Sequence, residues 1–179
     1  MRVPAPQGRR LDPRYRIEAL AESEATGEDV IAMWTGEGAL RPDAARERVR
    51  DVVLVALEER AGVVGVSTAW LQENSALGMD LWNYRTFVAR DHREGDIAFL
   101  LLHATRDHLR ERFTGGTETR AQGIVFEVQN EILKRARNEA VWPTSGFAFI
   151  GEDERGAHHR VHYFPGAIVP LPAGVGSGA

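Results

Sequence analysis

Residues 84–109 read YRTFVARDHREGDIAFLLLHATRDHL, and this stretch is the most informative part of the sequence. Its first half predicts a strand, and the apolar positions of its second half recur at helical spacing, which predicts a long amphipathic helix. At a helix start, unpaired backbone N–H groups and the positive end of the helix dipole attract phosphate. Arg93 would add a charged donor, and Gly95 would let a phosphate approach the backbone. The turn is therefore either a phosphate site or an ordinary connection in which Asp96 caps the helix.

Strands and helices alternate on both sides of this stretch. Runs of β-branched, aromatic and alternating apolar residues predict strands, and apolar residues three and four apart predict helices. The predicted strands are Tyr15–Leu20, Val52–Glu58, Val63–Leu71, Leu81–Ala89, Gly123–Val128, Phe147–Ile150 and His159–Phe164, and Gln72–Gly78 is predicted as a loop. The predicted helices are Thr26–Trp34, Asp43–Val49, Ile97–Phe113 and Asn130–Asn138. This order predicts an α/β (α+β) fold, a mixed central sheet flanked by helices on both faces.

In order and spacing, the stretch resembles the acyl-CoA motif of the GNAT (N-acetyltransferase) superfamily. In that motif a strand leads into a short turn, the pattern Arg/Gln-x-x-Gly-x-Gly/Ala follows, and a leucine-rich helix comes next. Here Arg93-Glu94-Gly95-Asp96-Ile97-Ala98 agrees with the pattern at its first and last positions. Asp96 stands where the motif has its middle glycine, so the motif is degenerate. The family's order of elements extends over Tyr15 to Phe164, which is most of the chain.

The resemblance implies an acyl-CoA-dependent N-acyltransferase. Acetyl-CoA or another acyl-CoA would be the co-substrate, and an amine of a small molecule or peptide would attack the thioester directly. The alternative is a GNAT-fold protein that binds CoA or another ligand without turnover, as a binding or scaffold protein. The resemblance implies cofactor binding by Phe87, Val88, His92, Arg93, Glu94, Gly95, Asp96, Ile97, Ala98 and Asn130.

Catalytic and acceptor-binding residues are predicted on two strands. Glu127 is a charged residue in an otherwise apolar strand, where a carboxylate can serve as a general base. Its alternatives are exposure to solvent or pairing with an arginine. Tyr84 would return a proton to the thiolate or bind the acceptor, and Arg85 and Trp82 would bind the acceptor. The alternative for Tyr84 and Arg85 is a packed or salt-bridged strand residue.

Composition and charge limit the partners, metal sites and membrane segments that the chain can have. The chain has 179 residues, a formal net charge of -4 and no cysteine, which argues against a nucleic-acid partner and excludes a thiolate zinc site. His158, His159 and His162 have no carboxylate or cysteine at ligand spacing, so no metal is expected. No apolar run reaches the ~20 residues of a membrane span. We expect a cytoplasmic protein without a membrane partner, able to form a homodimer, with one domain over 14–168 between flexible tails, 1–13 and 169–179.

Overall fold

The order of strands and helices follows the sequence-based prediction throughout. The computed structural model describes residues 11–93 and 96–170. The strands in this part of the chain are β1 (Tyr15–Ala19), β2 (Val52–Glu58), β3 (Gly62–Asn74), β4 (Met79–Val88), β5 (Gly123–Val128), β6 (Ala148–Glu152) and β7 (His158–Tyr163). The α-helices in the same ranges are α1 (Gly27–Gly36), α2 (Pro42–Arg48), α3 (Ile97–Thr114) and α4 (Glu131–Ala136).

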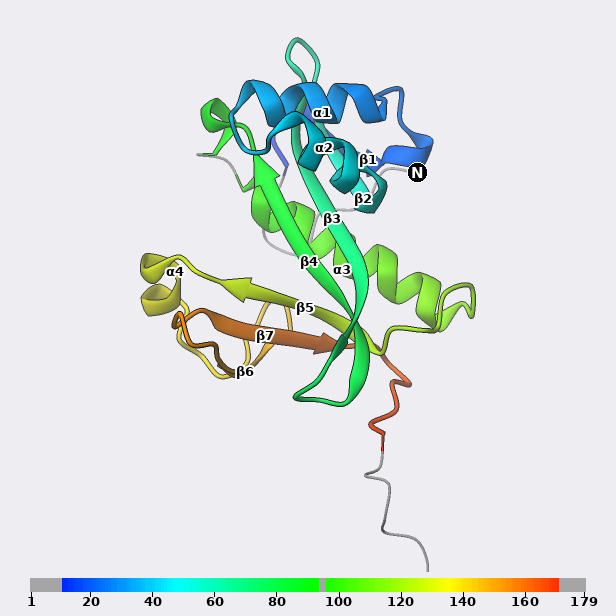
Figure 1. Ribbon diagram of the computed structural model, residues 1–179, viewed down its shortest axis with the longest axis vertical. Coiled ribbons are helices and arrows are strands. Elements are labelled where there is room, and N and C mark those ends of the chain that lie inside the picture. Colours follow the sequence, from blue (N-terminus) through cyan, green and yellow to red (C-terminus); the bar gives the residue numbers. More distant parts are fainter. Residues whose placement is uncertain (1–10, 94–95, 171–179) are drawn as a thin grey trace, which may run out of the picture. The chain divides into compact units, whose positions relative to one another are not determined.

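The seven described strands form one mixed sheet in the order β1-β2-β3-β4-β5-β7-β6, and Figure 1 labels them. The β1–β2, β2–β3, β5–β7 and β6–β7 pairs are antiparallel. β4 and β5 are parallel, and their shared ladder is short, joining Trp82 to Ile124 and Asn83 to Val125. The predicted fold class, a mixed sheet with helices, is confirmed.

By its internal contacts the chain divides into two compact units. The first consists of Met1–Trp70 and Tyr84–Leu109, and the second of Leu71–Asn83 and Arg110–Ala179. β3 and β4 each contribute residues to both units. The two units are therefore described separately.

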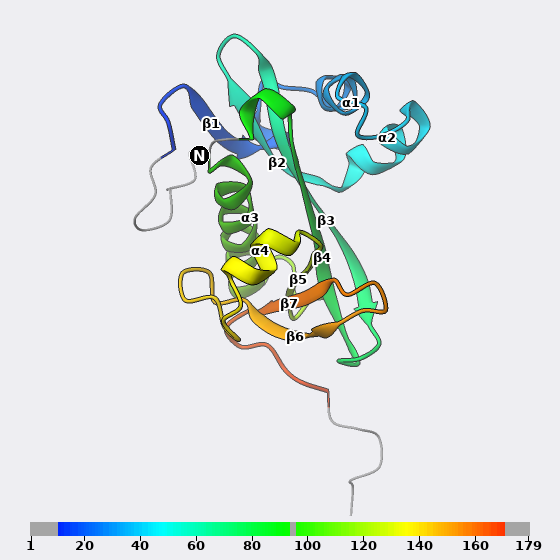
Figure 2. The same cartoon turned by 90° about the vertical axis from the view of Figure 1, so that its left-hand side faces the viewer.

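In the first unit, helices cover both faces of the sheet (Figure 2). Leu54 and Ala56 of β2 pack toward α3, whereas Val55 and Leu57 pack toward α1 and α2. This alternation is what a strand covered on both faces requires. Gly65 of β3 also lies under α3, and a methyl group added there would come within 3.3 Å of the Ile97 and Leu101 side chains.

Local signals explain where the first helices start. Thr26 precedes α1 and forms a capping box with Asp29, because each side chain binds the other residue's backbone N–H. Pro42 opens α2, a position where the missing N–H has no cost. Leu11, which falls in the predicted N-terminal tail, packs against the core beneath α3. Residues 1–10 and 171–179 of the predicted tails lie outside the described residues.

The second unit is built on β5, β7 and β6. Met79, Leu81, Val125 and Val161 form its apolar cluster. Gly123 starts β5 because a Cβ atom there would lie 2.4 Å from the carbonyl oxygen of His162. One prediction fails at the edge of this unit: β3 continues to Asn74, so the first residues of the predicted loop Gln72–Gly78 belong to a strand. Among the described helices, none has the length and apolar character that crossing a membrane requires.

Candidate active site

The turn between β4 and α3 holds the residues predicted to bind a pyrophosphate. Ala89 follows β4, and a short 3-10 turn then covers Arg90–His92. The Ala89 N–H donates to the carbonyl of Val64 on β3 at 2.8 Å, so the turn leaves the sheet at a fixed point. Glu94 and Gly95 lie outside the described residues.

Arg93 bends back over the end of β4. Its Nε donates to the Val88 carbonyl at 2.9 Å, and its guanidinium carbon lies 5.5 Å from the centre of the Phe87 ring. Phe87 is half-buried, and the Val88 side chain is buried in the core under α3. The positive charge of Arg93 is thereby held at the turn, where the sequence predicts an anionic ligand.

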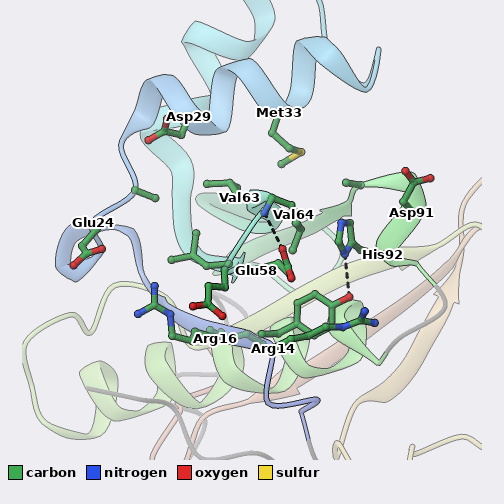
Figure 3. A pocket seen from close by; sticks show the side chains of 18 of the residues that line it. Arg14, Arg16, Glu24, Asp29, Met33, Glu58, Val63, Val64, Asp91 and His92 are labelled. Carbon is green, nitrogen blue, oxygen red and sulfur yellow. Dashed lines mark hydrogen bonds between the residues drawn. The ribbon is translucent and has the colours of Figure 1, made fainter.

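The His92 side chain contacts a residue that is distant in the sequence. Its Nδ1 lies 2.9 Å from the hydroxyl of Tyr15 on β1, and the two rings meet edge to face. This contact lines an open cavity of about 1200 Å³ within the first unit (Figure 3). The rim of the cavity carries several carboxylates, those of Glu24, Asp29, Glu58 and Asp91 among them.

At the start of α3, some residues are exposed to solvent and others are buried in the core. Asp96 is exposed, and its carbonyl accepts from the Leu100 N–H at 2.8 Å, which makes Asp96 the N-cap residue. Ile97 is 1% exposed and belongs to the core, so its side chain is not available to a ligand. Ala98 is exposed. Of the predicted motif residues at the helix start, Asp96 and Ala98 face solvent.

The predicted residues on β4 differ in accessibility. The Tyr84 side chain is buried, and burial raises the pKa of its phenol well above the ordinary value, so the group keeps its proton. Arg85 is exposed, and its guanidinium carbon lies 5.8 Å from the centre of the Trp70 ring. Arg48 contacts the same ring at 4.8 Å. Trp82 is half-buried at the short β4–β5 ladder, within the second unit.

Glu127, the predicted general base, lies in the second unit and faces a cation. Its Oε2 is 3.4 Å from Nη2 of Arg155 and 3.2 Å from Nε2 of Gln129. Pairing with an arginine was the alternative that the sequence left open for this residue. The Glu127 carboxylate also lies close to ligand atoms of Asp153 and His159. The sequence shows no carboxylate at ligand spacing from the histidines, but the β5–β7 pairing brings Glu127 close to His159, and the turn after β6 brings Asp153 there as well.

Asn130 caps α4. Its Oδ1 accepts from the backbone N–H groups of Ile132 and Leu133, at 2.9 and 3.0 Å. This explains why an asparagine follows β5 at the point where the helix begins. The cofactor contact predicted for Asn130 stays a prediction.

Comparison with known proteins identifies the fold. No protein-family model matches the sequence, and no curated protein sequence matches it. Solved structures do match. A GNAT-family acetyltransferase from Streptococcus pneumoniae superposes with a TM-score of 0.57 at 12% identity, over 84% of this chain and 99% of that one. The chain thus has the fold of the GNAT acetyltransferases.

Two further structures agree with this assignment. A ribosomal-protein-alanine N-acetyltransferase from Brucella melitensis gives a TM-score of 0.55 at 16% identity, over 83% of this chain and 99% of that one. A variant of the AtaT toxin, solved with acetyl-CoA and the C-terminus of the antitoxin AtaR, gives a TM-score of 0.51 at 14% identity, over 82% and 92%. At these identities the likeness is one of fold.

Proposed function

We propose that the protein is an acyl-CoA-dependent N-acyltransferase that transfers an acetyl group to an amine of a small molecule or peptide. The observation that carries this proposal is the β4–turn–α3 segment, which has the order of the acyl-CoA motif inside a GNAT fold. Acetyl-CoA is the ligand of one protein of the same fold, which supports it as the co-substrate here.

In this proposal the turn binds the pyrophosphate of the cofactor. The N-terminus of α3 supplies backbone donors and dipole, and the Arg93 guanidinium adds a positive charge close by. The backbone of Phe87 and Val88 would hold the pantetheine arm. Because the Val88 carbonyl accepts from Arg93, cofactor binding at this point requires Arg93 to share or release that carbonyl.

The chemical step needs a proton acceptor and a donor. The amine nitrogen would attack the thioester carbon, the carbon–sulfur bond would break, and the amine proton would pass to Glu127, directly or through water. Tyr84 would give a proton to the departing thiolate. The raised pKa of the Tyr84 phenol keeps its proton bound until the transfer. Because the side chain is buried, the transfer requires the thiolate to come close to the phenol.

One alternative function has specific support. A protein that binds CoA or another ligand without turnover would need no base, and the carboxylate of Glu127 is engaged by Arg155. Asp96 at the start of α3 also places a negative charge where the motif has a glycine. The pairing of Glu127 favours binding without catalysis, and the carboxylate of Asp96 favours a ligand other than CoA.

A thiol-release assay separates the two functions. Purified protein would be incubated with acetyl-CoA and a panel of amines that includes polyamines, aminoglycosides and peptides with a free N-terminus. Release of free CoA in step with acetylation of one amine class is the expected result. Cofactor binding without thiol release across the panel would instead favour the binding protein.

A further inference from the structure

We propose that Glu127, Asp153 and His159 form a binding site for Zn²⁺, separate from the acyl-CoA turn. Because Glu127 is also the general base of the proposed transfer, zinc bound to its carboxylate would oppose turnover. One ligand atom from each of these side chains lies within 4.8 Å of the other two, and all three residues belong to the second unit. An imidazole nitrogen and two carboxylate oxygens are a ligand set that zinc accepts, with a further position left for water.

The backbone places the three ligands on separate but paired segments. Glu127 on β5 lies directly opposite His159 on β7 in the antiparallel ladder. Side chains opposite each other in such a ladder have Cβ atoms about 5 Å apart and share a face of the sheet. Asp153 stands at the start of the turn that joins β6 to β7. A metal ion bound here would therefore link β5, β7 and the turn between β6 and β7.

Asp153 is already oriented as a metal ligand would be. Its Oδ1 accepts from the backbone N–H groups of Arg155 and Ala157, each at 2.9 Å. These bonds fix the carboxylate plane. Oδ2 accepts from Nε and Nη2 of Arg155 and lies 3.8 Å from Nε2 of His159. Hydrogen bonds that hold a ligand in place strengthen metal sites.

A cation already sits between the two carboxylates. Nη2 of Arg155 lies 2.8 Å from Oδ2 of Asp153 and 3.4 Å from Oε2 of Glu127. The Arg155 side chain is 68% exposed, so it can leave this position without disturbing the core. The guanidinium thus stands in for a positive ion that the site attracts, and it should compete with zinc.

The environment of the His159 side chain also supports a zinc site. Its Nε2 is shielded from solvent and has no hydrogen-bond partner among the described residues. Imidazole nitrogen is a common ligand of zinc in proteins. Bound zinc would satisfy this nitrogen and both carboxylates together.

Calorimetric titration of Zn²⁺ into the untagged, chelator-treated protein tests the site without any acyl-CoA. We expect one zinc ion per chain, and a visible absorption band when Co²⁺ replaces it. Asp153→Asn and His159→Ala should each weaken zinc binding at least tenfold. Arg155→Ala should strengthen it, because the competing cation is gone.

His158→Ala is the matched control, since His158 is the neighbouring residue on β7 and pairs with Glu152 instead, at 3.0 Å. This variant should bind zinc like the wild type. Thermal unfolding without metal checks that each variant is folded. The proposal is overturned if the wild type binds no zinc at millimolar concentration. It is also overturned if His158→Ala weakens binding as much as His159→Ala does, or if Arg155→Ala leaves the affinity unchanged or lowers it.

Discussion

Replacing Arg160 with methionine should destabilise the protein by about 3 kcal/mol, although the residue lies outside both proposed sites. Arg160 is on β7 and is 1% exposed. Its guanidinium donates to the carbonyls of Arg137, Glu139 and Phe147, at 3.2, 3.0 and 3.5 Å. It also lies 4.4 Å from the centre of the Trp142 ring. Arg160 therefore fastens the segment between α4 and β6 to the sheet.

The expected loss follows from which of these partners keep another donor. Trp142 donates its backbone N–H to the Phe147 carbonyl and its indole N–H to the Arg137 carbonyl, so both stay satisfied. The Glu139 carbonyl belongs to an exposed residue, and loss of its charge-assisted hydrogen bond from Arg160 costs about 1.5–3 kcal/mol. Loss of the cation–π contact adds about 1–2 kcal/mol. Methionine carries no charge that has to be buried, which offsets part of this loss. The cost of burying the charge is also seen in Arg160 itself, because burial lowers the pKa of its guanidinium.

The assay is urea unfolding followed by tryptophan fluorescence, with a thermal melt alongside. A loss of about 3 kcal/mol corresponds to a fall in Tm of about 6–12 °C for a chain of this size. Arg160→Lys should lie between the wild type and Arg160→Met, because one ammonium group replaces a planar fork. Arg135→Met, at an exposed position on α4, is the control and should change stability by less than about 0.5 kcal/mol. Equal stability of Arg160→Met and Arg135→Met would refute the reasoning.

Three other predictions concern the proposed active site and the response to pH. Glu127→Gln should keep acetyl-CoA affinity and lower turnover by roughly a hundredfold or more, as measured by thiol release; unchanged turnover would exclude Glu127 as the base. Tyr15→Phe removes the hydrogen bond to His92 and should cost about 1 kcal/mol in urea unfolding, whereas no measurable loss would mean that the contact contributes nothing. The side chain of Arg120 hydrogen-bonds Glu118 and lowers the pKa of that carboxyl from 4.5 to about 2. The stability it contributes is therefore present above pH 4.5 and is lost as the pH falls toward 2. Glu118→Gln should flatten the wild-type dependence of unfolding on pH in that window, and an unchanged slope would contradict this assignment.

The sequence predicted those elements whose pattern is local. Val52–Glu58 and Gly123–Val128 are strands with the predicted bounds, since each is an apolar run between clear breaks. Ile97–Phe113 is a helix with one more residue at its end, because apolar spacing and Gly115 define it. The end of β3 was missed, because its last residues are largely exposed and carry no alternating pattern.

The candidate sites were harder to predict from the sequence than the fold, because they depend on contacts between distant residues and not on spacing along the chain. Helical spacing favours a polar edge for His103, yet this residue is fully buried and packs 4.1 Å from the Phe99 ring, centre to centre. The Tyr15–His92 contact joins residues 77 positions apart, and it arises only when β1 takes its place in the sheet. No local signal in the sequence could have identified either feature.

The central claim is that the start of α3 binds the pyrophosphate of an acyl-CoA, and one calorimetric comparison tests it most directly. Acetyl-CoA would be titrated into the wild type, Ala98→Glu and Ala44→Glu. Ala98 and Ala44 are exposed alanines in the first turns of α3 and α2, where a glutamate favours the helix.

We predict 1:1 binding by the wild type and by Ala44→Glu, and at least tenfold weaker binding by Ala98→Glu, which is about 1.4 kcal/mol. All three proteins should have similar melting temperatures without ligand. Equal affinity of the two variants, or no heat from the wild type at millimolar acetyl-CoA, would contradict the assignment of this turn.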